Sequence, residues 1–179
     1  MAIASPFLGE TTRLLIRSWL LPQDLAAAWA IYSDPEVMAF IRPPVLTPAE
    51  LTAQLEERQQ HYEKRNNGTG RWALVEKATG QAIGTILLAE LPDAQGAVTA
   101  DYEVGWHLRR ASWGQGYATE AARWAIHYGF QSLHLSQIYA VVRPDNQRSI
   151  RVTQRLGMRS LGLTTAYYGR ELALFGITP

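Results

Sequence analysis

The chain has 179 residues, of which 47% are hydrophobic and 18% are charged, a balance typical of a globular protein rather than a disordered one. It contains no cysteine, which excludes disulfide bonds, thiolate zinc sites and a cysteine-linked acyl intermediate. A net charge of +1 gives no reason to expect nucleic acid as a partner. We therefore expect one domain over residues 1–179, with no metal site.

No stretch approaches the roughly 18 apolar residues of a membrane span, and the first ten residues lack the basic and apolar regions of a signal peptide. We therefore expect a cytoplasmic protein that does not bind membranes. Residues 105–159 carry a local excess of positive charge, because eight arginines there stand against two acids. Two interpretations of this segment remain open, namely a compact polyanionic partner and solvated helix faces.

The first half of the chain predicts a strand, two helices and a hairpin. Thr47, Pro48 and Glu50 form a capping box, in which a threonine precedes a helix and a glutamate follows it by three residues. The expected elements are a strand over 13–19, a helix over 22–33, a loop over 34–45, a helix over 48–65 and strands over 71–77 and 81–91.

The second half predicts alternating strands and helices. Residues 98–108 alternate between apolar and polar side chains, which only a strand requires. Asn146 caps a later helix, and Gly157 suits its left-handed end. The expected elements are strands over 98–108 and 137–143, helices over 117–131 and 146–156, and final strands over 160–168 and 170–177. The order is mixed α/β, with one parallel strand–loop–helix–strand unit.

The loop of that unit reads "WGQGYA" and precedes a helix. A helix N-terminus attracts anions, and Gly114 and Gly116 let the backbone approach a ligand closely, so we expect a bound pyrophosphate. Arg109 and Arg110 would add positive charge at the mouth of the loop, or they could equally be the solvent-facing end of a strand. The loop lacks the Gly-Lys-Ser/Thr of a P-loop, and Arg143 stands where a dinucleotide fingerprint would want an acid.

The loop resembles the acyl-coenzyme A signature Gln/Arg-x-x-Gly-x-Gly/Ala of the GNAT N-acetyltransferase superfamily, with Trp113 in the first place. In this respect the loop resembles one branch of the superfamily, the RimJ/RimL-like ribosomal-protein N-acetyltransferases, in which the same replacement is common. The likeness extends over nearly the whole chain, through the stretches "TTRLLIRSW", "SDPEVMAFI", "YEVGWHL", "WGQGYATEA", "RPDNQRSIRVTQRLGM" and "YYGRELALF". It implies a GNAT-like fold, whose mixed, mostly antiparallel sheet has about seven strands and about four flanking helices, with a splayed parallel pair at the cofactor.

The resemblance also implies which residues bind acetyl-coenzyme A, the cosubstrate. A strand backbone would pair with the pantetheine arm, the glycine loop would wrap the pyrophosphate, and the next helix would face the thioester. The implied residues are Trp106, His107, Leu108, Trp113, Gly114, Gln115, Gly116, Tyr117, Ala118, Thr119, Asn146 and Ser149. Arg151 and Arg155 are further candidates near the adenosine phosphate.

Without cysteine, acetyl transfer would proceed by direct attack of an amine in a ternary complex. Glu103 is the first candidate for the base, because it shares the polar face of its strand with His107, although both could be structural. Ser149 resembles the family serine near the sulfur, and an amide near Trp106 would hold the oxyanion. Tyr168 stands where the ribosomal-protein branch has a glutamate that can act as the base. Three mechanisms therefore remain open: Glu103 acts as the base, Tyr167 or Tyr168 acts as an acid, or the amine loses its proton in solvent.

The implied function is transfer of an acetyl group to a primary amine, either a protein N-terminus or a small molecule. A non-catalytic acyl-coenzyme A sensor, an antibiotic acetyltransferase and a nicotinamide-binding enzyme are the alternatives. The acceptor would be framed by residues 38–45 and 164–170, which are poor in acids, so cationic antibiotics are the less favoured acceptors. A monomer and a homodimer both remain open.

Overall fold

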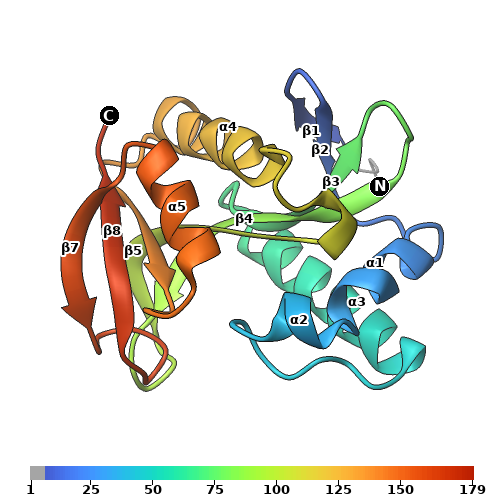
Figure 1. The fold of residues 1–179 in the computed structure, drawn as a ribbon, viewed down its shortest axis with the longest axis horizontal. Helices are drawn as coiled ribbons and strands as arrows, with labels where there is room; N and C mark the ends of the chain where they lie inside the picture. The colour runs from blue at the N-terminus through green and yellow to red at the C-terminus, as the bar shows by residue number, and fades with distance from the viewer. Residues whose placement is uncertain (1–6) are drawn as a thin grey trace. The chain divides into compact units, whose positions relative to one another are not determined.

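The structure is a computed structural model that describes residues 7–179. Figure 1 labels its elements, and the expectation about a signal peptide falls in part on residues 1–6, outside the described range. The strands are β1 (Phe7–Glu10), β2 (Leu14–Arg17), β3 (Gly70–Glu76), β4 (Ala82–Pro92), β5 (Val98–Leu108), β6 (Ile138–Val142), β7 (Arg159–Thr164) and β8 (Leu172–Ile177). The α-helices are α1 (Leu25–Tyr32), α2 (Pro35–Met38), α3 (Pro48–Arg65), α4 (Tyr117–Gln131) and α5 (Gln147–Arg155).

The eight strands form one sheet in the order β1-β2-β3-β4-β5-β6-β8-β7. The pairs at both ends of the sheet are antiparallel, whereas β5 and β6 are parallel and pair at Glu103 and Tyr139. This confirms the expected mixed, mostly antiparallel fold, with eight strands and five helices in place of about seven and four. The unexpected elements, β1 and α2, have four residues each, too few to show a periodic pattern.

The predicted helix over 22–33 begins late, at Leu25, and the predicted strand over 13–19 ends early, at Arg17. The cause is the Asp24 carboxylate, whose two oxygens accept hydrogen bonds from Arg17 at 2.6 and 3.0 Å. The same carboxylate accepts the Leu20 amide at 2.8 Å, so the chain between strand and helix is held in a turn. Side-chain contacts of this kind leave no periodic signal.

The chain divides into two compact units, which we describe separately. The first unit consists of the residues up to Ile86 together with Trp106–Tyr117, and the second consists of Leu87–Gly105 with Ala118–Pro179. The expectation of one domain over residues 1–179 stays a prediction.

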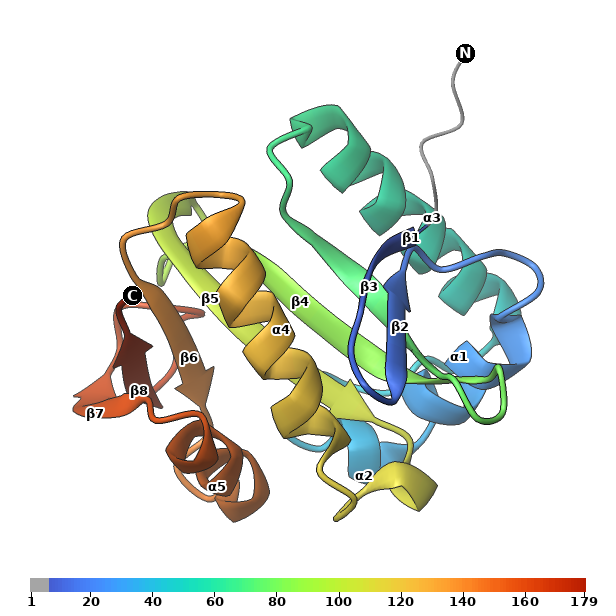
Figure 2. The same cartoon turned by 90° about the horizontal axis from the view of Figure 1, so that it is seen from above.

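In the first unit, helix α3 lies alongside β3, as Figure 2 shows, and covers a core of buried apolar side chains. The predicted capping box starts α3: the Thr47 hydroxyl accepts the Glu50 amide at 3.1 Å. The Glu50 carboxylate in turn accepts the Leu46 amide at 2.9 Å. The core includes Trp19, Ile31, Met38, Leu51 and Ala73.

In the second unit, α4 packs closely against the sheet because Gly129 has no side chain. A Cβ at Gly129 would lie 2.7 Å from Ile138 Cδ1 and 3.1 Å from Leu88 Cδ2. The buried side chains of this unit include Leu88, Val104, Ile138 and Phe175. Between residues 7 and 179 no helix has the length and apolar character that crossing a membrane requires. Nor does any group of three or more histidine, aspartate or glutamate side chains in that range converge as a metal site.

Candidate active site

The glycine loop of the first unit has a backbone that favours glycine at two positions. Gly114 and Gly116 adopt φ angles of +75° and +83°, in the left-handed region, immediately before α4 begins at Tyr117. The loop is exposed, and the amides of residues 114–116 donate no hydrogen bond to the described part of the chain. Main-chain donors followed by a helix N-terminus fit a phosphate group.

Arg13 supplies a cation to this loop, and no pattern in the sequence predicted its role there. Its Nη1 atom donates to the Gln115 carbonyl at 2.9 Å, and its guanidinium lies 4.2 Å from the centre of the Tyr117 ring. The Tyr117 hydroxyl donates to the Glu76 carboxylate on β3. Arg13, which directly precedes β2, and Glu76 on β3 therefore anchor the loop. No sequence signal could have revealed Arg13, since it precedes Gln115 by 102 positions.

Trp113 stands where the acyl-coenzyme A signature has glutamine or arginine, and it closes the loop onto β5. Its indole N–H donates to the Leu108 carbonyl at 2.8 Å, and its ring packs against the core of the first unit. The Leu108 carbonyl, one of the groups expected to pair with the pantetheine arm, thus already accepts one hydrogen bond from the protein. The tryptophan makes this contact because the 3₁₀ turn at Arg110–Ser112 brings the chain back over the end of the strand.

Arg110 does not add free positive charge to the loop, contrary to the prediction. Its Nε donates to Asp34 at 2.7 Å and its Nη1 to Glu36 at 2.5 Å, so two carboxylates neutralise it. Arg109 is held by the Ser112 hydroxyl at 3.1 Å and the Gln81 side chain at 3.0 Å. Both arginines thus brace the loop within the first unit.

The strand segment 106–108 is the predicted pantetheine contact. Trp106 and His107 are half-buried and Leu108 is buried. The parallel ladder between β5 and β6 contains the single pair Glu103–Tyr139, after which β5 continues to Leu108. A ladder this short agrees with a splayed pair of strands.

His107 is not the satisfied structural histidine that the sequence favoured. Its Nε2 atom is buried without a hydrogen-bond partner among residues 7–179, and its ring meets the Tyr32 ring edge-on at 5.2 Å. Burial, reinforced by the charges of Arg71, Arg58 and Arg42, lowers the pKa of His107 from 6.5 to about 3. The imidazole is therefore neutral at physiological pH.

This lowered pKa predicts an acid-sensitive protein. An unfolded chain protonates His107 as the pH falls through 6.5, whereas the folded chain does not until about pH 3, so stability is lost between these values. We expect a His107→Phe variant, which keeps an aromatic ring beside Tyr32, to show a shallower fall of melting temperature with acidification. Replacing the exposed His127 with glutamine is the control, and an unchanged pH dependence in His107→Phe would contradict the assignment.

In the second unit, Glu103 and Tyr168 lie together, although 65 positions separate them. Glu103 is buried, with 6% of its surface exposed, which rules out the half-exposed carboxylate considered from the sequence. The Tyr168 hydroxyl donates to Glu103 Oε1. Tyr168 has a left-handed φ of +59°, and the adjacent turn brings Gly169 against the Ala94 carbonyl.

A second pair of the same kind lies beside the first. The Tyr167 hydroxyl donates to Asp101 Oδ2 at 2.7 Å, and Asp101 precedes Glu103 by two positions on the same strand. Burial and this hydrogen bond raise the pKa of Tyr167, so its hydroxyl stays protonated. The sequence foresaw that Tyr167 and Tyr168 could serve a site, but not that each meets a carboxylate of β5.

Asn146 and Ser149 occupy the first turn of α5, as predicted. The Asn146 side chain accepts the Ser149 amide at 3.1 Å, so Asn146 caps the helix. Ser149 is half-buried, and Arg151 and Arg155 are exposed. Ala118 and Thr119 lie in the first turn of α4, where Thr119 is buried.

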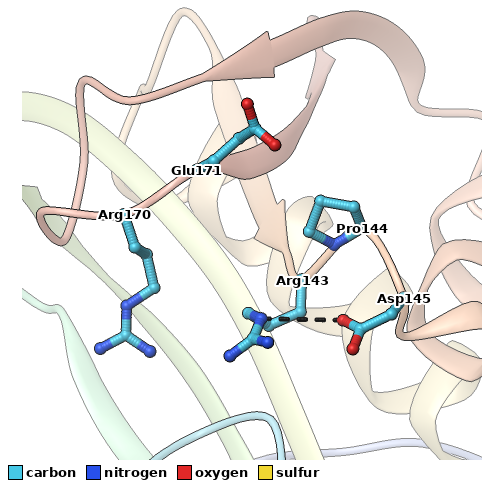
Figure 3. A pocket seen from close by; sticks show the side chains of 5 residues that line it. All are labelled: Arg143, Pro144, Asp145, Arg170 and Glu171. Carbon is cyan, nitrogen blue, oxygen red and sulfur yellow. Dashed lines mark ion pairs between the residues drawn. The ribbon is translucent and has the colours of Figure 1, made fainter.

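A hollow of about 370 Å³ lies in the second unit between the end of β6 and the start of β8. Figure 3 shows Arg143 and Arg170 extending in the same direction, while Glu171 points away from them. Arg143 pairs with Asp145 at 3.7 Å. The hollow is lined by Arg143, Pro144, Asp145, Arg170 and Glu171, so it carries both signs of charge.

The sequence matches the family of the acetyltransferase (GNAT) domain over residues 13–159. It is 31% identical to an uncharacterized N-acetyltransferase, p20, of Bacillus licheniformis, over 88% of this chain and 85% of that protein. It is 26% identical to the spermidine N(1)-acetyltransferase of Escherichia coli (strain K12), over 54% of this chain and 50% of that protein.

The fold agrees with a solved structure, that of the ribosomal-protein-S5-alanine acetyltransferase of Vibrio fischeri. The TM-score is 0.72, the identity is 18%, and the alignment covers 95% of each chain. At this identity the likeness shows the fold, and it does not confirm the ribosomal-protein branch. Because the family match spans most of the sequence, the chain belongs to the GNAT family and is an acyl-coenzyme A-dependent acetyltransferase.

Proposed function

We propose that the protein transfers the acetyl group of acetyl-coenzyme A to a primary amine, by direct attack within a ternary complex. The observation that carries this proposal is the glycine loop before the N-terminus of α4. Its glycines have left-handed backbone angles, and its backbone amides donate no hydrogen bond to the described part of the chain. The family's use of acetyl-coenzyme A supports it, as does the relative named for an amine acceptor. The absence of cysteine from the sequence favours direct attack.

In this proposal the residues of the loop hold the cosubstrate. The amides of residues 114–116 bind the diphosphate, with Arg13 fixing the Gln115 carbonyl so that the neighbouring N–H groups point outward. The strand segment 106–108 faces the pantetheine arm through the main chain of Trp106 and His107. Other residues support the segments that carry these donors. Trp113 holds the loop against β5, Asn146 caps α5, and the first turn of α4 contains Tyr117, Ala118 and Thr119.

The reaction forms a bond between the amine nitrogen and the thioester carbonyl carbon, and it breaks the carbon–sulfur bond. The amine loses one proton, and the departing thiolate takes one up. We assign the first proton to Glu103, which accepts the Tyr168 hydroxyl. Tyr168 would give its own proton to the thiolate and take the proton of the amine back from Glu103, while the Ser149 hydroxyl stabilises the thiolate. A strand amide near Trp106 would hold the oxyanion.

The type of amine decides how much help the base must give. With a reference pKa near 7.8, a peptide α-amino group costs roughly 1 kcal/mol to deprotonate at pH 7, and a lysine near 10.4 costs about 5 kcal/mol. We therefore infer that the acceptor is a protein N-terminus or a small α-amine rather than a lysine side chain.

Incubation with acetyl-coenzyme A and a panel of amines tests the proposal. We expect free thiol to appear in proportion to acetylated amine, which a thiol reagent and mass spectrometry measure together. Acetyl-coenzyme A at about 100 times its Kd is expected to stabilise the fold by about 2.7 kcal/mol, whereas NAD is expected to have no effect. Binding without thiol release would instead identify a sensor, and stabilisation by NAD would contradict the assignment.

A further inference from the structure

Three arginines of the first unit converge on one pair of aromatic rings. The guanidinium carbons of Arg42, in the segment after α2, and Arg58, on α3, lie 5.9 and 5.8 Å from the centre of the Tyr32 ring. The edge of His107 meets the same ring at 5.2 Å. Arg71, on β3, donates from Nε to the Tyr62 hydroxyl at 3.3 Å and acts electrostatically on His107. We call Arg42, Arg58 and Arg71 the arginine cluster.

Two members of the cluster, Arg42 and Arg58, make no ion pair with a carboxylate in the described part of the chain. Within residues 7–179 the guanidinium groups of Arg42 and Arg58 form no hydrogen bond or ion pair, and Arg42 Nη2 is buried without an acceptor. Glu50 is the carboxylate that acts on Arg42, but its two oxygens already accept the Leu46 amide and the Gln54 side chain, both at 2.9 Å. Both side chains are half-buried, and a buried donor such as Arg42 Nη2 that lacks an acceptor costs free energy, which a bound anion would recover.

The charges in the cluster disfavour one another. Burial, followed by repulsion from the neighbouring arginines, lowers the pKa of both Arg42 and Arg58. The contacts with the Tyr32 ring give little in return, because both distances lie at the outer limit of about 6 Å for a cation–π interaction. An anion bound among the guanidinium groups would remove the repulsion and supply the missing acceptor.

The cluster is separate from the residues that serve the diphosphate. Arg13 is the cation at the glycine loop, where it contacts Gln115 and Tyr117. His107, in contrast, belongs to the strand segment 106–108, which we assign to the pantetheine arm. The cluster thus adjoins, through His107, the part of the first unit that leads toward the acetyl group. A ligand bound there is the acceptor rather than the cosubstrate.

We propose that the acceptor is a primary amine that carries a carboxylate, and that Arg42 and Arg58 bind this carboxylate with support from Arg71. The inference rests on the proposed acetyl transfer. Guanidinium groups bind planar carboxylates through paired hydrogen bonds, and they repel polyamines such as spermidine. The carboxylate belongs either to a free amino acid or to an acidic side chain next to a peptide N-terminus. The loop at 38–45, expected from sequence to be an apolar frame, contributes a binding charge through Arg42.

Matched pairs of acceptors test the proposal. Each common amino acid is compared with its α-carboxamide, and peptides with aspartate or glutamate in second place are compared with their asparagine or glutamine counterparts. We measure kcat/KM for each acceptor from the rate of thiol release. In at least one of the two sets, the amino acids or the peptides, we expect kcat/KM to be about tenfold to a hundredfold higher for the carboxylate than for its amide counterpart. The set that shows the preference identifies the source of the carboxylate.

The variants Arg58→Met and Arg42→Met keep the length of the side chain but remove its charge. We expect each to lose most of this preference, because KM for the carboxylate acceptor rises. KM for acetyl-coenzyme A should stay unchanged, and Lys64→Met, an exposed change on α3, should behave as the parent protein. Melting temperatures show whether each variant folds, and the two arginine variants check one another. An equal rate for carboxylate and carboxamide, or a preference that survives both variants, would overturn the proposal.

A binding measurement separates this proposal from the proposed function. Calorimetry with N-acetyl amino acids, the products of the preferred pair, is expected to show binding to the parent protein and not to Arg58→Met, without any turnover. Binding of these carboxylates with no thiol release from any amine would refute acetyl transfer and leave the anion site standing. Thiol release without discrimination in binding or rate would refute the anion site alone.

Discussion

A Glu103→Gln variant is expected to lose about a hundredfold to ten-thousandfold of kcat, the range that a positioned general base supplies. Glutamine keeps the size of the side chain and still accepts the Tyr168 hydroxyl, so the buried pair should stay packed. It cannot take a proton from the amine. Steady-state rates at several pH values measure the loss, and the limb of the pH–rate profile that reports ionisation of the base should disappear.

Asp101→Asn is the matched control, because Asp101 accepts Tyr167 on the same strand just as Glu103 accepts Tyr168. It removes a carboxylate from an equivalent hydrogen-bonded pair, and we expect kcat to change little. If the two variants lose activity equally, a structural effect on β5 explains both. If Glu103→Gln keeps full activity on a peptide N-terminus, the amine is deprotonated in solvent and Glu103 is not the base.

Replacing Gly116 with valine is expected to raise the Kd for acetyl-coenzyme A by about tenfold or more. A β-branched residue at φ +83° is strained by about 1–3 kcal/mol, and every 1.4 kcal/mol corresponds to a tenfold change in Kd. Without ligand, the loop can change its backbone and relax this strain. Binding of the diphosphate requires the original backbone angles, so the strain energy lowers the affinity. The added Cβ would meet only Arg13 Nη2, at 3.5 Å, so the fold itself should survive. Calorimetry measures the Kd.

Gly80→Val provides the same strain away from the loop. Gly80 lies in the β3–β4 turn with φ +68°, and a Cβ there meets nothing within 4 Å. We expect the two variants to lower the melting temperature to a similar extent, while only Gly116→Val weakens acetyl-coenzyme A. An unchanged Kd in Gly116→Val would mean that the diphosphate is bound elsewhere.

Local patterns of the sequence determined the elements that carry the site. The alternation of residues 98–108 predicted β5 with its observed bounds, and the caps at Thr47 and Asn146 predicted the starts of α3 and α5. The change to helical spacing after the loop glycines predicted that α4 starts at Tyr117. These features were readable because strand alternation, caps and turn glycines act within a few residues of chain, so the signal and its structural effect lie in the same short stretch.

Only the tertiary structure decided which side chains meet. Arg110 is neutralised by Asp34 and Glu36, more than 70 positions away, and Arg13 reaches Gln115 across 102 positions. The arginine cluster draws on α3, β3 and the segment after α2, and the Glu103–Tyr168 pair joins β5 to the turn before β8. The physical reason is that such contacts depend on strand register and on how helices pack on the sheet. A shift of one residue in either would turn these side chains away, and no local pattern records it.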